Sequence, residues 1–162
     1  MATGHVTTLQ IDGLSPPPAP TADDVENEEK TPASSVKVER QTVAVGDSLR
    51  LEFSFNLPDG YKLNESAPAS CRLRTKSSTD VIAPAELARH HRAELGKHKA
   101  VVTIPLAHKS GEAAFDVSLS FTYCRDGVGG ICKLGSGHWT VPIEFATDAK
   151  QSGVNLTATV RE

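Results

Sequence analysis

The sequence predicts an all-β fold: an antiparallel β-sandwich with one short helical insertion, preceded by an acidic, proline-rich linker. The first observation is apolar alternation with a period of two, which gives a strand one buried and one wet face. The second is turn chemistry between the alternating segments, at 45–47, 58–60, 110–111 and 152–153. Seven or so such strands need a second sheet to cover their apolar faces, and this favours a sandwich.

The apolar alternation locates the expected strands along the chain. The four clearest segments are 47–57, 114–123, 138–145 and 153–160, and the shorter candidates are 35–45, 71–75 and 100–106. Pro142 interrupts one of these patterns. Since proline cannot donate to a ladder, the strand that contains it is expected at a sheet edge or at a bulge.

One segment has helical features. Residues 84–98 (PAELARHHRAELGKH) begin with Pro84 at a first-turn position and have Gly96 near their end. Their apolar positions form only a narrow stripe. We therefore expect a helix here that is inserted between strands and builds little of the core.

Charge and composition divide the chain of 162 residues. Residues 14–34 hold five prolines and five acidic residues against one lysine, a net charge of −4, so the rest carries +1 of the total of −3. Proline and like charges extend a chain, so 14–34 is interpreted as a linker and 35–162 as the β-sandwich domain. Residues 1–13 hold one alternating strand, which must add to a sheet edge or be the remnant of another domain.

The same composition excludes some partners. No apolar run approaches the roughly 20 residues of a membrane helix, so no membrane span is expected. No basic stripe with interleaved aromatics suggests nucleic-acid binding. The start of the chain shows no signal peptide, which favours the cytoplasm slightly over an extracytoplasmic compartment while leaving localisation open.

Cys124 and Cys132 are the candidate functional residues. They flank a glycine-rich segment that could turn and bring two strand ends together at the Cα separation of a disulfide. Three interpretations stay open: a structural or absent bond, a redox-active pair, and a metal site. Arg125 and Lys133 bring positive charge close in sequence, which favours thiolate, although neighbours along a strand point to opposite faces.

Other chemistry is weakly represented. The histidines show no ligand-like spacing to the cysteine pair and are expected to face solvent, so no metal and no cofactor is predicted. The histidines concerned are His90, His91, His98, His108 and His138. Cys71 is expected to be a buried, inert thiol. Phosphate loops, nucleophile elbows and HExxH helices are absent from the sequence.

Two segments carry a family resemblance, FNLPDGYKLNESAP and FTYCRDGVGGICKLGSGHWTVPIEF. Together they resemble the C-terminal β-domain of proteins that join a thioredoxin-like domain, an NHL-repeat propeller and a β-sandwich. The matching positions are Leu57, Pro58, Gly60, Tyr61, Leu63, Asn64, Ala67 and Pro68, then Tyr123, Cys124, Cys132, Val141 and Pro142. The opening ATGHVTTLQIDGL is similar to the outer strands of a last NHL blade. The resemblance implies that 1–13 is a propeller remnant and that thioredoxin-like and NHL domains of one parent chain are the partners.

The same segments resemble the N-terminal domain of the disulfide reductase DsbD, which implies an immunoglobulin-like sandwich. In that domain a cysteine pair shuttles electrons beside a strand similar to Asp59–Leu63. The resemblance makes Cys124 and Cys132 a redox pair and Tyr61 a possible shield over the sulfurs. Here seven residues separate the cysteines, a longer spacing than in that domain, and no counterpart of its aromatic cap is evident.

Two functions follow as alternatives. The first is an accessory or interaction domain of a thioredoxin-like NHL-repeat protein, without catalysis of its own. The second is a thiol–disulfide exchange module in which Cys124 and Cys132 relay electrons to a thioredoxin-like domain. Enzyme activity is uncertain, and if present it is that of a thiol–disulfide oxidoreductase.

Overall fold

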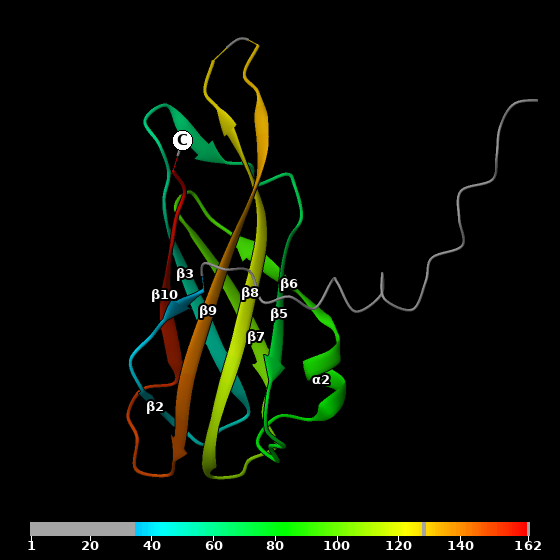
Figure 1. The fold of residues 1–162 in the computed structure, drawn as a ribbon, viewed down its shortest axis with the longest axis vertical. Helices are drawn as coiled ribbons and strands as arrows, with labels where there is room; N and C mark the ends of the chain where they lie inside the picture. Colours follow the sequence, from blue (N-terminus) through cyan, green and yellow to red (C-terminus); the bar gives the residue numbers. More distant parts are fainter. Residues whose placement is uncertain (1–34, 128, 162) are drawn as a thin grey trace, which may run out of the picture. The chain divides into compact units, whose positions relative to one another are not determined.

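The computed structural model describes residues 35–127 and 129–161 (Figure 1). The predictions for 1–13 and 14–34 lie outside the described residues. The all-β prediction is confirmed, because the described residues form ten strands and one short helix. The elements are β1 (Val36–Lys37), β2 (Gln41–Ala44), β3 (Ser48–Asn56), β4 (Tyr61–Leu63), β5 (Ala69–Thr75), α2 (Pro84–Ala88), β6 (His90–Leu95), β7 (Lys99–Pro105), β8 (Gly111–Arg125), β9 (Cys132–Ala146) and β10 (Gly153–Thr159).

The strands form one continuous mixed sheet in the order β1-β9-β8-β5-β6-β7-β3-β10. β2 also pairs with β9, and β4 pairs with β8. The expectation of a purely antiparallel sheet is wrong, since β1 and β2 run parallel to β9 and β10 runs parallel to β3. Alternation has the same period in both kinds of pairing, so the sequence pattern could not distinguish them.

The core lies between the two halves of the curled sheet, and aromatic side chains join them. Phe53 on β3 packs against Trp139 on β9 with ring centroids 5.4 Å apart, and Phe55 meets Phe121 on β8 edge-on at 4.7 Å. The Trp139 indole N–H also donates to the carbonyl of Thr157 on β10, 3.2 Å away. Each aromatic pair contributes about 1 kcal/mol beyond its buried area, so these contacts fix how the halves face each other.

The short helix expected within 84–98 is present, but it covers only the first part of that segment. Only Pro84–Ala88 is helical, and His90–Leu95 is β6, which pairs with β5 on one side and β7 on the other. Alternate residues of β6 face the core, so His91 and Ala93 are buried. Pairing with β5 and β7, together with the burial of His91 and Ala93, outweighs the local helix propensity of this segment.

His91 is therefore not solvent-facing, which corrects the expectation for that residue. Its Nε2 lies 2.8 Å from the Glu86 carbonyl oxygen, so the buried ring has a hydrogen-bond partner within α2. This contact ties the short helix to the sheet and gives His91 a structural role.

The strand that contains Pro142 is not at the edge of the sheet, because β1 and β2 flank β9, but Pro142 itself lies at a local gap in that pairing. It lies in β9 opposite Ala114 of β8, but on the other side of β9 the pairing with β1 stops at Thr140 and the pairing with β2 starts at Ile143. The missing N–H of Pro142 thus falls at a break between two short edge strands.

β8 and β9 form a long hairpin whose register is unbroken from Gly111 opposite Phe145 to Cys124 opposite Cys132. Its far end, yellow and orange at the top of Figure 1, reaches past most of the other strands, where β4 pairs with β8. The cysteine pair therefore lies at the end of a ribbon whose other end builds the core.

Candidate functional site

Cys124 and Cys132 are joined by a disulfide between directly opposed positions of β8 and β9. Their Cα atoms are 4.0 Å apart and the S–S distance is 2.09 Å. The next pair along the hairpin is hydrogen-bonded, with the Arg125 N–H donating to the Ile131 carbonyl at 3.0 Å. The structure thus brings the two predicted site residues together.

The disulfide lies on the outer face of the sheet, away from the core. Along β8 the odd-numbered residues, including Phe121 and Tyr123, are buried, so Cys124 projects from the opposite side. Cys124 is half-buried and Cys132 is exposed. The bond is therefore open to solvent, and no core side chain depends on it for packing.

Lys62 is the cation that shares this face with the sulfurs. It lies directly opposite Cys124 in the β4–β8 pair, and directly opposed residues project from the same side of a sheet. Its Nζ donates to Asp126 Oδ1 at 2.7 Å. That hydrogen bond, followed by the Lys62 charge, holds the pKa of Asp126 below its ordinary value.

Arg125 and Lys133 are the cations that the sequence predicts near the sulfurs. Lys133 follows Cys132 directly, but its Nζ lies 5.3 Å from the centroid of the Tyr61 ring, on the face opposite to the sulfurs. Lys62 was missed because its link to Cys124 depends on the long-range register of β4. A local clue existed, since the Pro58–Gly60 turn followed by alternation would have put Tyr61 and Lys62 on opposite faces.

Tyr61 packs on the inner side of the hairpin end. Its ring centroid is 5.5 Å from that of Tyr123, and its partner across β4–β8 is Arg125. Alternation along β4 separates it from Lys62 and hence from the face of the disulfide. A shielding role for Tyr61 stays a prediction, and its ring contacts give it no support.

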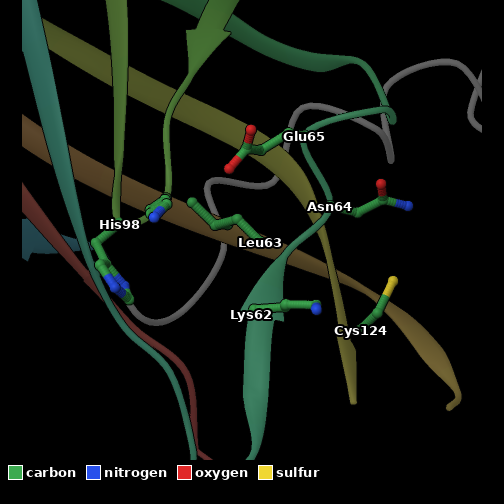
Figure 2. A pocket seen from close by; sticks show the side chains of 7 residues that line it. Lys62, Leu63, Asn64, Glu65, His98 and Cys124 are labelled. Carbon is green, nitrogen blue, oxygen red and sulfur yellow. The ribbon is translucent and has the colours of Figure 1, made fainter. Parts of the chain in front are cut away.

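A cleft of about 580 Å³ begins beside the disulfide (Figure 2). It passes along β4 toward the turn between β6 and β7, so it joins parts of the chain that are distant in sequence. Its lining residues are Lys62, Leu63, Asn64, Glu65, Lys97, His98 and Cys124. Most of these side chains are polar or charged, and Leu63 is the apolar residue among them.

Large apolar side chains are exposed around the same hairpin end. Leu134 is 85% exposed and Ile131 is 68% exposed; the other exposed large apolar residue of the described chain is Val36 on β1, at 55%. Leu134 lies on β9, Ile131 lies on the turn before β9, and Val36 lies on the neighbouring strand β1. Exposed apolar residues gathered on one edge are typical of contact sites.

Cys71, the third cysteine, is buried in β5 without a disulfide, as the sequence predicts. Burial raises the pKa of its thiol to about 12. The thiol therefore stays protonated at neutral pH and is not a nucleophile.

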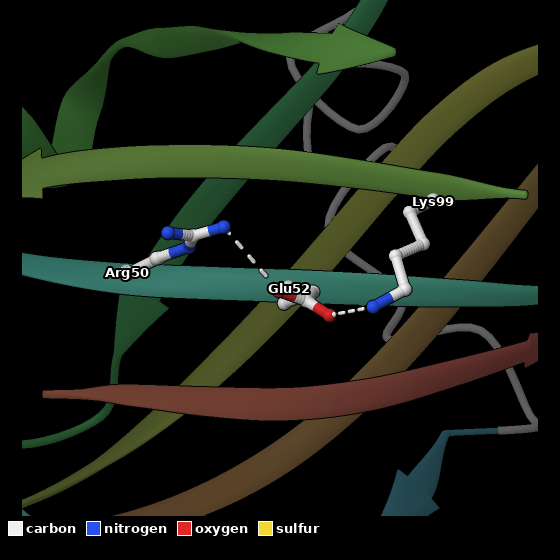
Figure 3. A network of polar contacts seen from close by, with 3 residues as sticks. All are labelled: Arg50, Glu52 and Lys99. Atoms are coloured by element: carbon white, nitrogen blue, oxygen red, sulfur yellow. Dashed lines mark hydrogen bonds and ion pairs between the residues drawn. The ribbon is translucent and has the colours of Figure 1, made fainter. Parts of the chain in front are cut away.

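A second polar cluster lies on the solvent face of β3 and β7 (Figure 3). Glu52 contacts Lys99 Nζ and Arg50, the latter at 3.4 Å. The hydrogen bond from Lys99 and its charge lower the pKa of Glu52. Because the three side chains satisfy one another across neighbouring strands, we interpret the cluster as a support of strand pairing.

Within residues 35–127 and 129–161, no group of three or more His, Cys, Asp or Glu side chains is placed to hold a metal ion. No helix in the same part is long and apolar enough to cross a membrane. No protein-family model and no curated protein matches this sequence.

Proposed function

We propose that the domain is a thiol–disulfide exchange module whose working group is the Cys124–Cys132 pair. The single observation that carries this proposal is an exposed disulfide outside the core, with a lysine directly opposite one of its cysteines. Exposed disulfides are the ones that exchange, because the attacking thiolate must reach a sulfur.

The exchange has two steps. A partner thiolate attacks the sulfur of one cysteine and forms a mixed disulfide with it. The Cys124–Cys132 bond breaks, and the other cysteine leaves as a free thiolate. A second partner thiol then displaces the first cysteine. Two electrons and two protons thus pass from the partner dithiol to the pair, and the partner ends as a disulfide. Reversal oxidises the pair and reduces the partner.

Lys62 supports one direction of this chemistry. When Cys132 is attacked, Cys124 becomes the leaving group, and a nearby ammonium favours the thiolate that leaves. Asp126 holds the lysine and offsets part of its charge. The proposal therefore gives Lys62 a positioning and electrostatic role.

A purely structural bond is less well supported. The disulfide joins strands that are already paired along the whole hairpin, and it closes a loop of only nine residues, worth about 2.5 kcal/mol in the chain-entropy model. The core on the other face of the sheet is built without it.

The proposed exchange partner is the thioredoxin-like domain that the family resemblance implies, in the same parent chain as an NHL propeller. No cofactor is needed, since the pair itself carries the electrons.

An accessory or interaction domain remains the second candidate. The exposure of Ile131 and Leu134 favours it, because both could contact a propeller or another partner. In that case the cysteines could be replaced without loss of binding.

The proposal is tested by mixing the oxidised protein with reduced thioredoxin, then quenching with an alkylating agent and measuring mass. We expect both Cys124 and Cys132 to become labelled while buried Cys71 stays unlabelled. An intact disulfide in the folded protein after prolonged incubation would reject exchange and favour the interaction domain.

A further inference from the structure

One side of β9 near the disulfide has no strand partner among the described residues. β1 pairs with β9 only from Trp139 onward, so 132–137 is paired with β8 alone. We call residues 132–137, on the side away from β8, the β9 free edge.

The backbone groups on the β9 free edge can be identified from the ladder. The Thr140 carbonyl accepts a hydrogen bond from the Val38 N–H at 3.0 Å, so Thr140 points away from β8. Backbone groups alternate in direction along an antiparallel strand. The N–H and C=O groups of Cys132, Leu134 and Ser136 therefore point away from β8, as those of Thr140 do. The Ile131 carbonyl, which accepts from Arg125 of β8, fits this alternation.

The disulfide joins directly opposed residues of β8 and β9, so it bridges the two strands and Cys132 is its cysteine on the strand with the free edge. A thiolate attacks a sulfur in line with the bond that breaks, so attack on Cys132 comes from the side of β9 that faces away from β8. That is the place where an added strand would lie.

The side chains along the edge indicate what that strand would carry. Leu134 projects from the same face as Cys132, two residues further along, and is almost fully exposed. In a paired strand, residues two apart share a face. A cysteine opposite Cys132 would therefore be accompanied by an apolar residue opposite Leu134.

We propose that the substrate of this site is a cysteine in an extended peptide segment, which adds as a strand to the β9 free edge. This inference rests on the proposed exchange function and specifies its substrate class. Backbone hydrogen bonds would provide affinity, the Leu134 contact would provide selection, and β pairing would aim the thiolate at Cys132. The mixed disulfide then forms at Cys132, with Cys124 leaving as the thiolate beside Lys62.

The experiment uses the oxidised full chain and two thiol probes. One probe is a synthetic peptide with a central cysteine and valines two residues away on either side; the other is dithiothreitol. Its control is the same peptide N-methylated at the amides that would face β9. We expect the N-methylated peptide to react roughly five- to tenfold more slowly than the parent peptide, the effect of losing one or two net hydrogen bonds, and the mixed disulfide to map to Cys132.

Protein variants give an independent measurement. Ser136→Pro removes one N–H of the free edge, and Pro142 shows that β9 accepts proline at a position of the same orientation. We expect Ser136→Pro and Leu134→Ala to slow the peptide and leave the dithiothreitol rate unchanged. Ser120→Ala is the control, because Ser120 lies opposite Ser136 on β8 and away from the edge.

The outcomes separate the two proposals. If neither probe reduces the disulfide, the exchange function itself is wrong. If dithiothreitol reacts but N-methylation and Ser136→Pro have no effect on the peptide, strand addition is wrong and exchange stands. A dimer in the absence of peptide that Ser136→Pro dissociates would assign the edge to a second copy of the chain and overturn the substrate assignment.

Discussion

Lys62 lies directly opposite Cys124 across the β4–β8 pair, and both side chains project from the outer face of the sheet. A lysine thus lies directly across from one cysteine of an exposed disulfide. Lys133 is the sequence neighbour of the other sulfur, yet it lies over Tyr61 on the inner side. The two lysines carry the same charge and differ in the face they occupy.

That difference predicts the behaviour of a matched pair of variants. Lys62→Gln should slow exchange and the alkylation of reduced Cys124 at neutral pH by roughly three- to fivefold at low salt, because the thiolate loses a nearby ammonium. Asp126→Asn should have the opposite effect, since it frees the Lys62 charge. Alkylation rates across pH provide the measurement.

Lys133→Gln is the control for charge alone, and it should leave these rates nearly unchanged. Equal effects from Lys62→Gln and Lys133→Gln would mean that only the net charge of the hairpin end matters. Raising the salt concentration should reduce the Lys62 effect, since exposed charges are screened.

The backbone at Gly135 packs so closely against Phe121 that a larger residue would not fit without rearrangement. A Cβ at this position would lie 2.6 Å from the ring of Phe121, which is buried in the core. Gly135→Ala should therefore lower the free energy of unfolding by about 1–3 kcal/mol, the range for overpacking. Urea denaturation measures this, with Gly46→Ala as the control because nothing lies within 4 Å of a Cβ there. Similar losses for both variants would contradict the packing argument.

Cys71 predicts a loss of stability in alkali. Burial raises the pKa of its thiol from the ordinary value of 9.0 to about 12. The unfolded thiol therefore ionises first, so the stabilising contribution is complete below about pH 9 and is lost as the pH rises toward 12. The slope is at most about 1.4 kcal/mol per pH unit.

The measurement compares the free energy of unfolding at about pH 8 and about pH 10.5 with and without Cys71→Ala. The background is Cys124→Ser with Cys132→Ser, so that no disulfide can exchange. We expect the parent to lose about 2 kcal/mol more than the Cys71→Ala variant over this interval. Equal losses would show that the Cys71 thiol is not desolvated.

Removing the disulfide should weaken the domain without unfolding it. Closure of nine residues is worth about 2.5 kcal/mol, and the Trp139 contacts lie on the other face of the sheet. The reduced protein should keep the fluorescence of buried Trp139 and show a lower urea midpoint. Loss of that fluorescence signal on reduction would make the bond a structural requirement and weaken the exchange proposal.

The sequence alone predicts where most strands lie, but it does not predict which strands pair with each other. Alternation located β3, β8, β9 and β10, because each has one face in the core. It could not reveal the parallel pairing of β10 with β3, since period and burial are the same in either direction. Residues 90–95 have a weak helical stripe, and only the sheet's need for a strand between β5 and β7 explains β6.

Part of the candidate site could be predicted from local sequence, and part depends on long-range contacts. The glycine-rich segment between Cys124 and Cys132 was enough to predict a turn, and the structure brings the two cysteines into one bond. Lys62 and the cleft along β4 depend on contacts between residues far apart in sequence. Tyr61 was chosen through a resemblance, and its place beside Tyr123 follows from the register of β4.

The central claim is that the Cys124–Cys132 bond is reversible under cellular redox conditions. A titration of the folded protein in redox buffers, with the fraction of reduced pair read by alkylation and mass, tests it most directly. We predict a reversible two-electron transition within the thioredoxin–glutathione range, about −270 to −200 mV. A pair that stays fully oxidised down to about −300 mV would contradict the claim, because structural disulfides have potentials below that value.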